Sequence, residues 1–177
     1  MLETMVGWTV CPGCGLRLRS EGGERDYRVN ASPDCLRVYA EVTGFGAQNP
    51  SLLRLNQLSL DAYGAQHGGG GVPPIRLTYS LVGLHLALDH GLTGEQVRAA
   101  HQRMGKPNAT WPTLTVPSDL GQMTVMTVAE QGLMRHSVSG HEATTRHWAK
   151  SVWLAWASQR QLITHLTRRL LPSLDSL

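Results

Sequence analysis

Apolar residues recur at helical spacing along most of the chain after residue 31. Ser-Pro-Asp at 32–34 is a helix start, with a capping hydroxyl, a proline at the first helical position and an early carboxylate. This helix is expected to end near Gly44. Asn-Pro at 49–50 repeats the signal, and residues 53, 57, 60, 64 and 67 then fall on one line at helical spacing, which predicts a second helix that runs to about His67.

The next segments alternate apolar runs with glycine and proline. Four glycines and two prolines between residues 68 and 74 permit a sharp change of direction. The segment from about 74 to 90 is apolar nearly all round, which predicts the central, buried helix. A shorter helix is expected from Thr93 to about Met104.

The C-terminal half predicts one long loop and one long helix. Residues 106–122 are expected to form an extended loop over the core, with Trp111 and Leu114 tucked inward. Residues 123–129 fit either a short strand or a helix start. A regular core-facing stripe predicts a single last helix from roughly residue 140 to 171.

These elements predict an all-α protein with a single domain of about five helices over residues 1–177. The chain has 177 residues, of which 41% are hydrophobic, enough for one sizeable core. Within it, residues 1–31 are expected to be an irregular arm, with at most a short hairpin between Leu16 and Val29. Residues 32–177 would form the helical core.

Charge and hydropathy exclude some classes of function. The formal net charge is only +3, and the predicted core-directed tryptophans leave no basic aromatic surface, so nucleic-acid binding is not expected. Residues 1–10 lack a basic leader and no run reaches about 18 apolar residues, so we expect a cytoplasmic protein without membrane spans. Trp153 and Leu154 lie off the core stripe and fit either a homodimer contact or a seat for the Trp111 loop.

The spacing of the cysteines is the one sequence pattern that indicates specific chemistry. Cys11 and Cys14 have the Cys-x-x-Cys spacing that brings two sulfurs to one tetrahedral zinc ion, and Gly15 lets the chain turn behind them. Cys35 lies at a predicted helix N-terminus, where the helix dipole favours the thiolate. In a reducing compartment the three cysteines fit metal ligands better than a disulfide, which would leave one thiol over.

Other interpretations of the cysteines are a mobile arm with one buried cysteine and a thioredoxin-like redox site. The redox motif should open a helix after a strand, whereas residues 15–19 show no helical stripe. A zinc site is therefore favoured, and it requires a fourth ligand.

Three residues are candidates near the zinc. His67, at the end of the second predicted helix, is the first choice, although its ring could instead bond the last carbonyls of its own helix. His85 lies in the apolar third helix, where it either ligates metal or hydrogen-bonds a backbone carbonyl or Asp61. Asp61 could orient a metal-bound histidine, act as a general base, or be an ordinary half-exposed helix aspartate.

These segments together resemble a family of bacterial proteins of unknown function. Its members carry a Cys-Pro-x-Cys-Gly knuckle, Asn-Ala-Ser-Pro-x-Cys, Asp-Ala-Tyr-x-x-Gln-His, a histidine within a helix, and Ser-Val-Trp-x-Ala-Trp. This chain matches at residues 11–15, 30–35, 61–67, 85 and 151–156. The resemblance implies that one pattern unites six residues and draws them together: Cys11, Cys14, Cys35, Asp61, His67 and His85.

The resemblance supplies no activity. Family members often have paired histidines after the Ala-Trp segment, where this chain has Gln159 and Arg160, which argues against metal ligands in the last helix. The leading hypothesis is a zinc-stabilised helical module whose closed ligand shell is structural, with no catalytic residue assigned and no partner identified. The rival is a metal-dependent hydrolase-like enzyme with an open metal site involving Asp61, His67 and His85, assisted by Tyr63.

Overall fold

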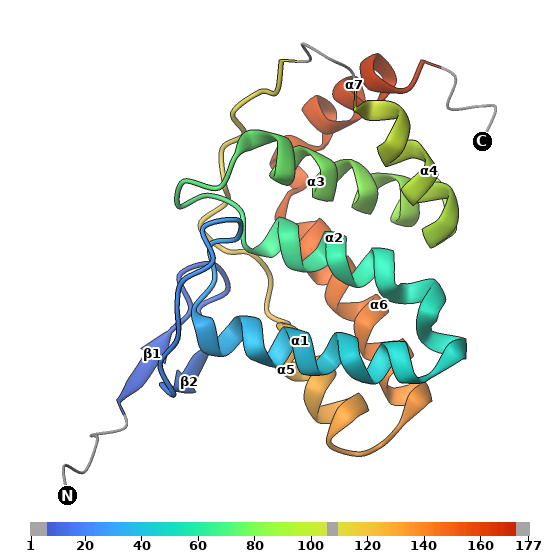
Figure 1. Ribbon diagram of the computed structural model, residues 1–177. Coiled ribbons are helices and arrows are strands. Elements are labelled where there is room, and N and C mark those ends of the chain that lie inside the picture. Colours follow the sequence, from blue (N-terminus) through green and yellow to red (C-terminus); the bar gives the residue numbers. More distant parts are fainter. Residues whose placement is uncertain (1–6, 106–109, 173–177) are drawn as a thin grey trace, which may run out of the picture.

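The computed structural model describes residues 7–105 and 110–172. In this part of the chain, seven α-helices and a small two-stranded antiparallel hairpin form one mostly helical domain, as expected (Figure 1). The expectations about the first six residues and the beginning of the 106–122 loop concern positions outside the described residues.

Two helices begin where the capping signals place them, whereas the Asn-Pro signal at 49–50 starts a 3-10 turn and the helix that ends near His67 begins only at Asn56. The Ser32 hydroxyl accepts a hydrogen bond from the Cys35 N–H, and Thr93 forms a capping box with Gln96. The α-helices are α1 Pro33–Gln48, α2 Asn56–Gln66, α3 Pro74–Leu88, α4 Gly94–Met104, α5 Val125–Val128, α6 Val138–Ala155 and α7 Arg160–Leu170. Short 3-10 turns at Pro50–Leu55 and Ala157–Gln159 and a π-helical turn at Ala129–Leu133 complete the helical elements of the described residues.

The prediction of a single last helix is wrong. The chain leaves α-helical geometry at Trp156 and makes a 3-10 turn before α7 begins at Arg160. Trp156 is fully buried at this bend, and α7 packs against α3. The apolar stripe continues across the bend, from Val152 to Ile163, so periodicity alone did not mark it. The sequence of residues 123–129 fitted either a strand or a helix start, and this segment contains the short helix α5.

The hairpin encloses the cysteine turn. Strands β1 Trp8–Val10 and β2 Arg17–Arg19 pair with Trp8 opposite Arg19, so the hairpin does not lie between Leu16 and Val29 as expected. The Cys11 N–H donates to the Leu16 carbonyl at 2.8 Å, which closes the turn. Gly15, at φ 72°, donates its N–H to the Cys11 carbonyl at 2.9 Å.

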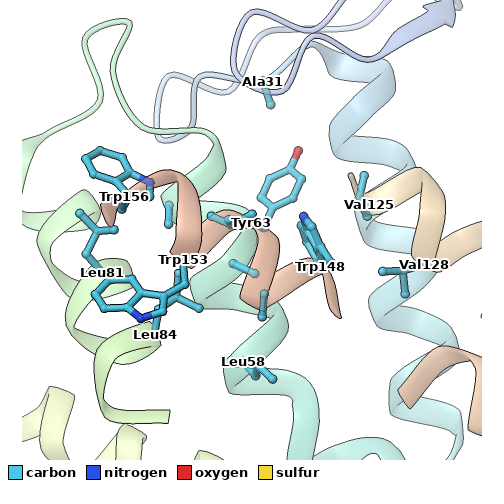
Figure 2. Packing of buried hydrophobic residues seen from close by; sticks show 14 of the residues in the cluster. Ala31, Leu58, Tyr63, Leu81, Leu84, Val125, Val128, Trp148, Trp153 and Trp156 are labelled. Atoms are coloured by element: carbon cyan, nitrogen blue, oxygen red, sulfur yellow. The ribbon is translucent and has the colours of Figure 1, made fainter. Parts of the chain in front are cut away.

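The central helix is α2, although the sequence pattern favoured α3. Helix α2 packs against α1, α3, α4 and α6, and even its polar residues, such as Gln57 and Gln66, are buried (Figure 1). The Gln66 amide oxygen accepts a hydrogen bond from the Trp148 indole at 2.9 Å. Figure 2 shows Tyr63 of α2 beside Trp148 of α6 within the main apolar cluster. Paired polar groups therefore replace the apolar stripe that would have marked α2 as central.

Trp153, Leu154 and the loop before α5 were expected to lie at the surface or over the core, and the structure places the described residues of each. Trp153 is buried in the core, and its indole donates to an Asp89 carboxylate oxygen at 2.9 Å. Leu154 is 64% exposed and lies beside loop residues 117–122. Leu114 is buried, and Trp111 is half-buried against Tyr79. None of the helices in the described residues combines the length and apolar character needed to cross a bilayer.

Candidate metal centre

Four residues from three separate segments meet beside the hairpin. Cys11 and Cys14 come from the turn between β1 and β2, Cys35 from the first turn of α1, and His67 from the residue that follows α2. One donor atom from each lies within 4.8 Å of all the others. Figure 1 shows how the hairpin lies against the start of α1, which makes this meeting possible.

The spacing of the donor atoms matches a tetrahedral ion. The sulfurs of Cys14 and Cys35 are 3.8 Å apart, and the Cys35 sulfur is 3.5 Å from Nε2 of His67. Tetrahedral zinc, with Zn–S near 2.3 Å and Zn–N near 2.0–2.1 Å, would separate two sulfurs by about 3.8 Å and a sulfur from a nitrogen by about 3.6 Å. A disulfide would need about 2.05 Å, and all three cysteines are free.

The His67 ring is oriented by its own helix. Nδ1 lies 2.8 Å from the Tyr63 carbonyl oxygen, one helical turn earlier. An Nδ1–H that donates to this carbonyl leaves the Nε2 lone pair facing the cysteines. The two interpretations of His67 that the sequence left open therefore hold together: it bonds a carbonyl of α2 and also faces the cysteines.

Tyr63 supports the cluster from one side. Its hydroxyl donates to the Cys35 sulfur at 3.6 Å, and its ring stacks on His67 with centroids 4.0 Å apart. Tyr39 stacks on the other face of Tyr63 at 3.9 Å. The sequence analysis gave Tyr63 only a role in the rival enzyme. Its supporting role at the cluster could have been inferred from its position four residues before His67, on the same face of α2.

The four side chains of the cluster shift one another's pKa values strongly. Hydrogen bonds from Cys14 and then from Cys35 lower the pKa of the Cys11 thiol far below its ordinary value. Hydrogen bonds to Cys11 and Cys14, with burial, raise the pKa of Cys35. Burial by itself lowers the pKa of His67, but hydrogen bonds and charges from Cys11 and Cys14 outweigh it and raise the pKa to about 9. Hydrogen bonds within the cluster and the charge of His67 thus stabilise the Cys11 thiolate, and a divalent cation can take over this role.

Gly13 lets the cysteine turn approach α2 closely. A Cβ at this position would lie 2.6 Å from the His67 ring carbon Cδ2 and 2.5 Å from the Asn30 carbonyl oxygen. The Asn30 N–H in turn donates to the His67 carbonyl at 2.9 Å. The second variable position of the Cys-x-x-Cys turn is therefore restricted to glycine, a constraint that the spacing of the cysteines did not reveal.

Asp61 and His85 lie outside the cluster. Both carboxylate oxygens of Asp61 accept from the Gln57 amide nitrogen, at 3.1 and 3.0 Å. His85 bonds Asp89 at 2.9 Å through Nδ1, and its Nε2 lies 3.3 Å from Nε2 of His90. In the described residues, four of the six residues that the resemblance united come together. The orienting role expected of Asp61 belongs to the Tyr63 carbonyl.

The cluster is closed to solvent on most sides. Cys11, Cys35 and His67 are each at most 1% exposed, and Cys14 is half-buried. Three cavities, of about 680, 580 and 320 Å³, open elsewhere in the described residues, and none of the four cluster residues lines any of them. The arrangement suits an ion held by protein donors alone.

Comparison with known proteins gives one match. A model described as "Family of unknown function (DUF5946)" matches residues 9–157, a span that includes all four residues of the cluster as well as Asp61 and His85. No curated protein and no solved structure matches the chain.

Proposed function

The chain belongs to this family of unknown function, DUF5946, and we propose that it is a helical module stabilised by a structural zinc ion bound by Cys11, Cys14, Cys35 and His67. One observation carries the proposal: four donor atoms, from segments up to 56 positions apart (67 − 11), lie within 4.8 Å of one another at spacings that suit a tetrahedral ion.

The donor set favours zinc. Three thiolates and one imidazole are the ligands of common structural zinc sites, and soft sulfur donors disfavour magnesium and calcium. Three free thiols also fit a reducing compartment, which supports a cytoplasmic location.

The zinc ion would fasten the N-terminal arm to the helices. The hairpin strands are three residues each, and Trp8 and Val10 are 63% and 56% exposed, so the arm buries little apolar surface. Ligation by Cys11 and Cys14 from the arm, and by Cys35 and His67 from α1 and α2, supplies the energy that burial does not.

A closed shell argues for structure over catalysis. Catalytic zinc keeps a position for water, whereas four protein donors fill a tetrahedron. The rival hydrolase-like site required Asp61, His67 and His85 around one ion, and their hydrogen bonds direct them to different partners. No catalytic step is therefore assigned to the metal.

Elemental analysis of protein purified under reducing conditions tests the proposal. One zinc per chain is expected, and X-ray absorption should give three sulfur and one nitrogen neighbours. Protein that is folded throughout its N-terminal arm but binds no metal would refute it. A shell containing a water oxygen in place of the imidazole would support the open, catalytic alternative instead.

A further inference from the structure

A second candidate site lies on the other side of Tyr63. A cavity of about 580 Å³ opens between α1, α2, α3, α4 and the segment 26–29. Its lining includes Asp61 and three tyrosines, Tyr39, Tyr63 and Tyr79. The volume falls within the range of small-molecule sites, about 300–1,000 Å³.

Asp61 is the unusual group in this lining. Its side chain is only 3% exposed, and among the described residues its one hydrogen-bond donor is the Gln57 amide, with no ion pair. Asp61 and Gln57 also line a third cavity of about 320 Å³, so Asp61 borders two cavities. Burial raises the pKa of Asp61 well above its ordinary value, because the charged form lacks a cationic partner.

The helices leave room for this carboxylate. A Cβ on Gly83 of α3 would lie 2.1 Å from Oδ2 of Asp61, so only glycine lets α3 approach. His101 of α4, 3.5 Å from the Gln57 amide nitrogen through Nδ1, supplies no positive charge, because burial lowers its pKa to about 4. A buried carboxylate without a cation is costly, and a cation entering the cavity would supply what the chain does not.

The tyrosine rings favour a cation at Asp61, whereas the charge of Arg76 opposes its entry. The face of an aromatic ring carries negative potential, which attracts ammonium and guanidinium groups. Both faces of Tyr63 are covered by Tyr39 and His67, so among the three tyrosines this attraction falls to Tyr39 and Tyr79. Arg28 is held by Asp26 at 2.7 Å, so this pair contributes little net charge at the rim. Arg76, which is exposed, forms no ion pair within the described residues and stands at the mouth.

We propose that this cavity binds a small organic cation, whose amino or guanidino group pairs with Asp61 and whose body lies among Tyr39, Tyr63 and Tyr79. The site is independent of the zinc ion in its ligand chemistry. Tyr63 links the two, because its ring lines the cavity and its hydroxyl bonds the Cys35 sulfur.

Titration of the zinc-loaded protein, followed by NMR, tests this proposal. The probes are benzylammonium and guanidinium, with benzyl alcohol and benzoate as matched neutral and anionic controls. Benzylammonium should bind in the millimolar range expected for so small a ligand, and the controls at least tenfold more weakly. Equal binding of benzyl alcohol or benzoate, or no binding of either cation by the wild-type protein, would overturn the proposal.

Two variants locate the site. Asp61→Asn keeps the shape of the side chain and should weaken benzylammonium binding at least tenfold without changing the zinc content. Glu130→Gln removes one exposed negative charge elsewhere and should leave binding unchanged. Unchanged affinity in Asp61→Asn contradicts the proposal, while loss of zinc from the wild-type protein would bear only on the metal site.

Arg76→Glu provides a test that does not disturb the interior. Arg76 is exposed at the mouth of the cavity, so its replacement should leave the fold intact. Reversal of this charge should strengthen benzylammonium binding severalfold at low salt, and less so at high salt. Weaker binding in Arg76→Glu would show that the cation does not enter at this mouth.

Discussion

Tyr63 and His67 contact each other twice within one turn of α2. Their rings stack with centroids 4.0 Å apart, and the Tyr63 carbonyl lies 2.8 Å from Nδ1 of His67. The Tyr63 hydroxyl also bonds the sulfur of Cys35. A single helical turn therefore carries one donor of the metal cluster, the carbonyl that orients its ring and the hydroxyl that bonds the neighbouring Cys35 sulfur.

Cys14→Ser is expected to lower zinc content and loosen the N-terminal arm. A serine hydroxyl is a poor zinc ligand, and three remaining donors hold the ion more weakly. Helices α1 to α7 keep their own apolar core, so helical circular dichroism should change little. Elemental analysis and hydrogen exchange measure the two effects.

Ser20→Ala serves as the control for this variant, because Ser20 lies just after β2, outside the cluster. It should retain zinc and the protection of the arm. Full metal retention in Cys14→Ser, or equal loosening in both variants, would count against zinc ligation by Cys14.

Tyr63→Phe isolates the hydroxyl that bonds Cys35. The phenylalanine ring keeps the stacking on His67 and Tyr39, while the donor to the sulfur is lost. Loss of groups that support metal ligands typically costs 10–100-fold in affinity, so zinc affinity should fall by about this factor. Competition with a chromophoric chelator measures it. An unchanged affinity would mean that the hydroxyl does not stabilise the thiolate.

The members of the metal cluster could be predicted from sequence because their chemistry is local. Cys-x-x-Cys spacing, a cysteine in the first turn of a capped helix and a histidine at a helix end each restrict where a donor atom can point. These restrictions made Cys11, Cys14, Cys35 and His67 candidates, and the family resemblance implied that they meet, together with Asp61 and His85, which lie outside the cluster. The supporting roles of Tyr63, which the sequence linked only to the rival enzyme site, and of Gly13 were not predicted, because they depend on how close α2 and the cysteine turn approach.

Other parts of the fold could not be predicted, because they depend on hydrogen bonds between residues far apart in the sequence. Gln66 looks like a surface residue, yet it is fully buried because it bonds the Trp148 indole 82 positions away. Asp89 similarly satisfies both His85 and Trp153. A buried polar pair between distant helices therefore decided that α2 is central, whereas His85 bonds Asp89, an exposed residue only four positions away.

Gly13→Ala tests the close approach of the cysteine turn to His67. The new Cβ would meet backbone and ring atoms within 2.6 Å, so the turn must move away from α2. A loss of about 1–3 kcal/mol in stability is expected from this overpacking, together with weaker zinc binding. Thermal unfolding and zinc competition measure both effects.

Gly44→Ala is the matched control for Gly13→Ala. Gly44 lies within α1, and a Cβ there meets open space. Alanine should stabilise this helix by roughly 0.5–1 kcal/mol without changing zinc affinity. If Gly13→Ala bound zinc as tightly as Gly44→Ala, the turn would have to lie farther from His67 than the short Cβ distances imply.

Asp61→Asn is expected to stabilise the protein at neutral pH. Burial raises the folded-state pKa of Asp61, so the stabilising contribution of this carboxyl is present below its ordinary pKa, near 4, and is lost as the pH rises. Asparagine carries no charge to desolvate, so the variant should gain about 1 kcal/mol at pH 7 and little at pH 4. Denaturant unfolding of both proteins between these pH values measures the difference, and any zinc loss common to both cancels. A variant less stable than wild type at pH 7 would show that the Asp61 carboxylate has a stabilising partner in the folded protein.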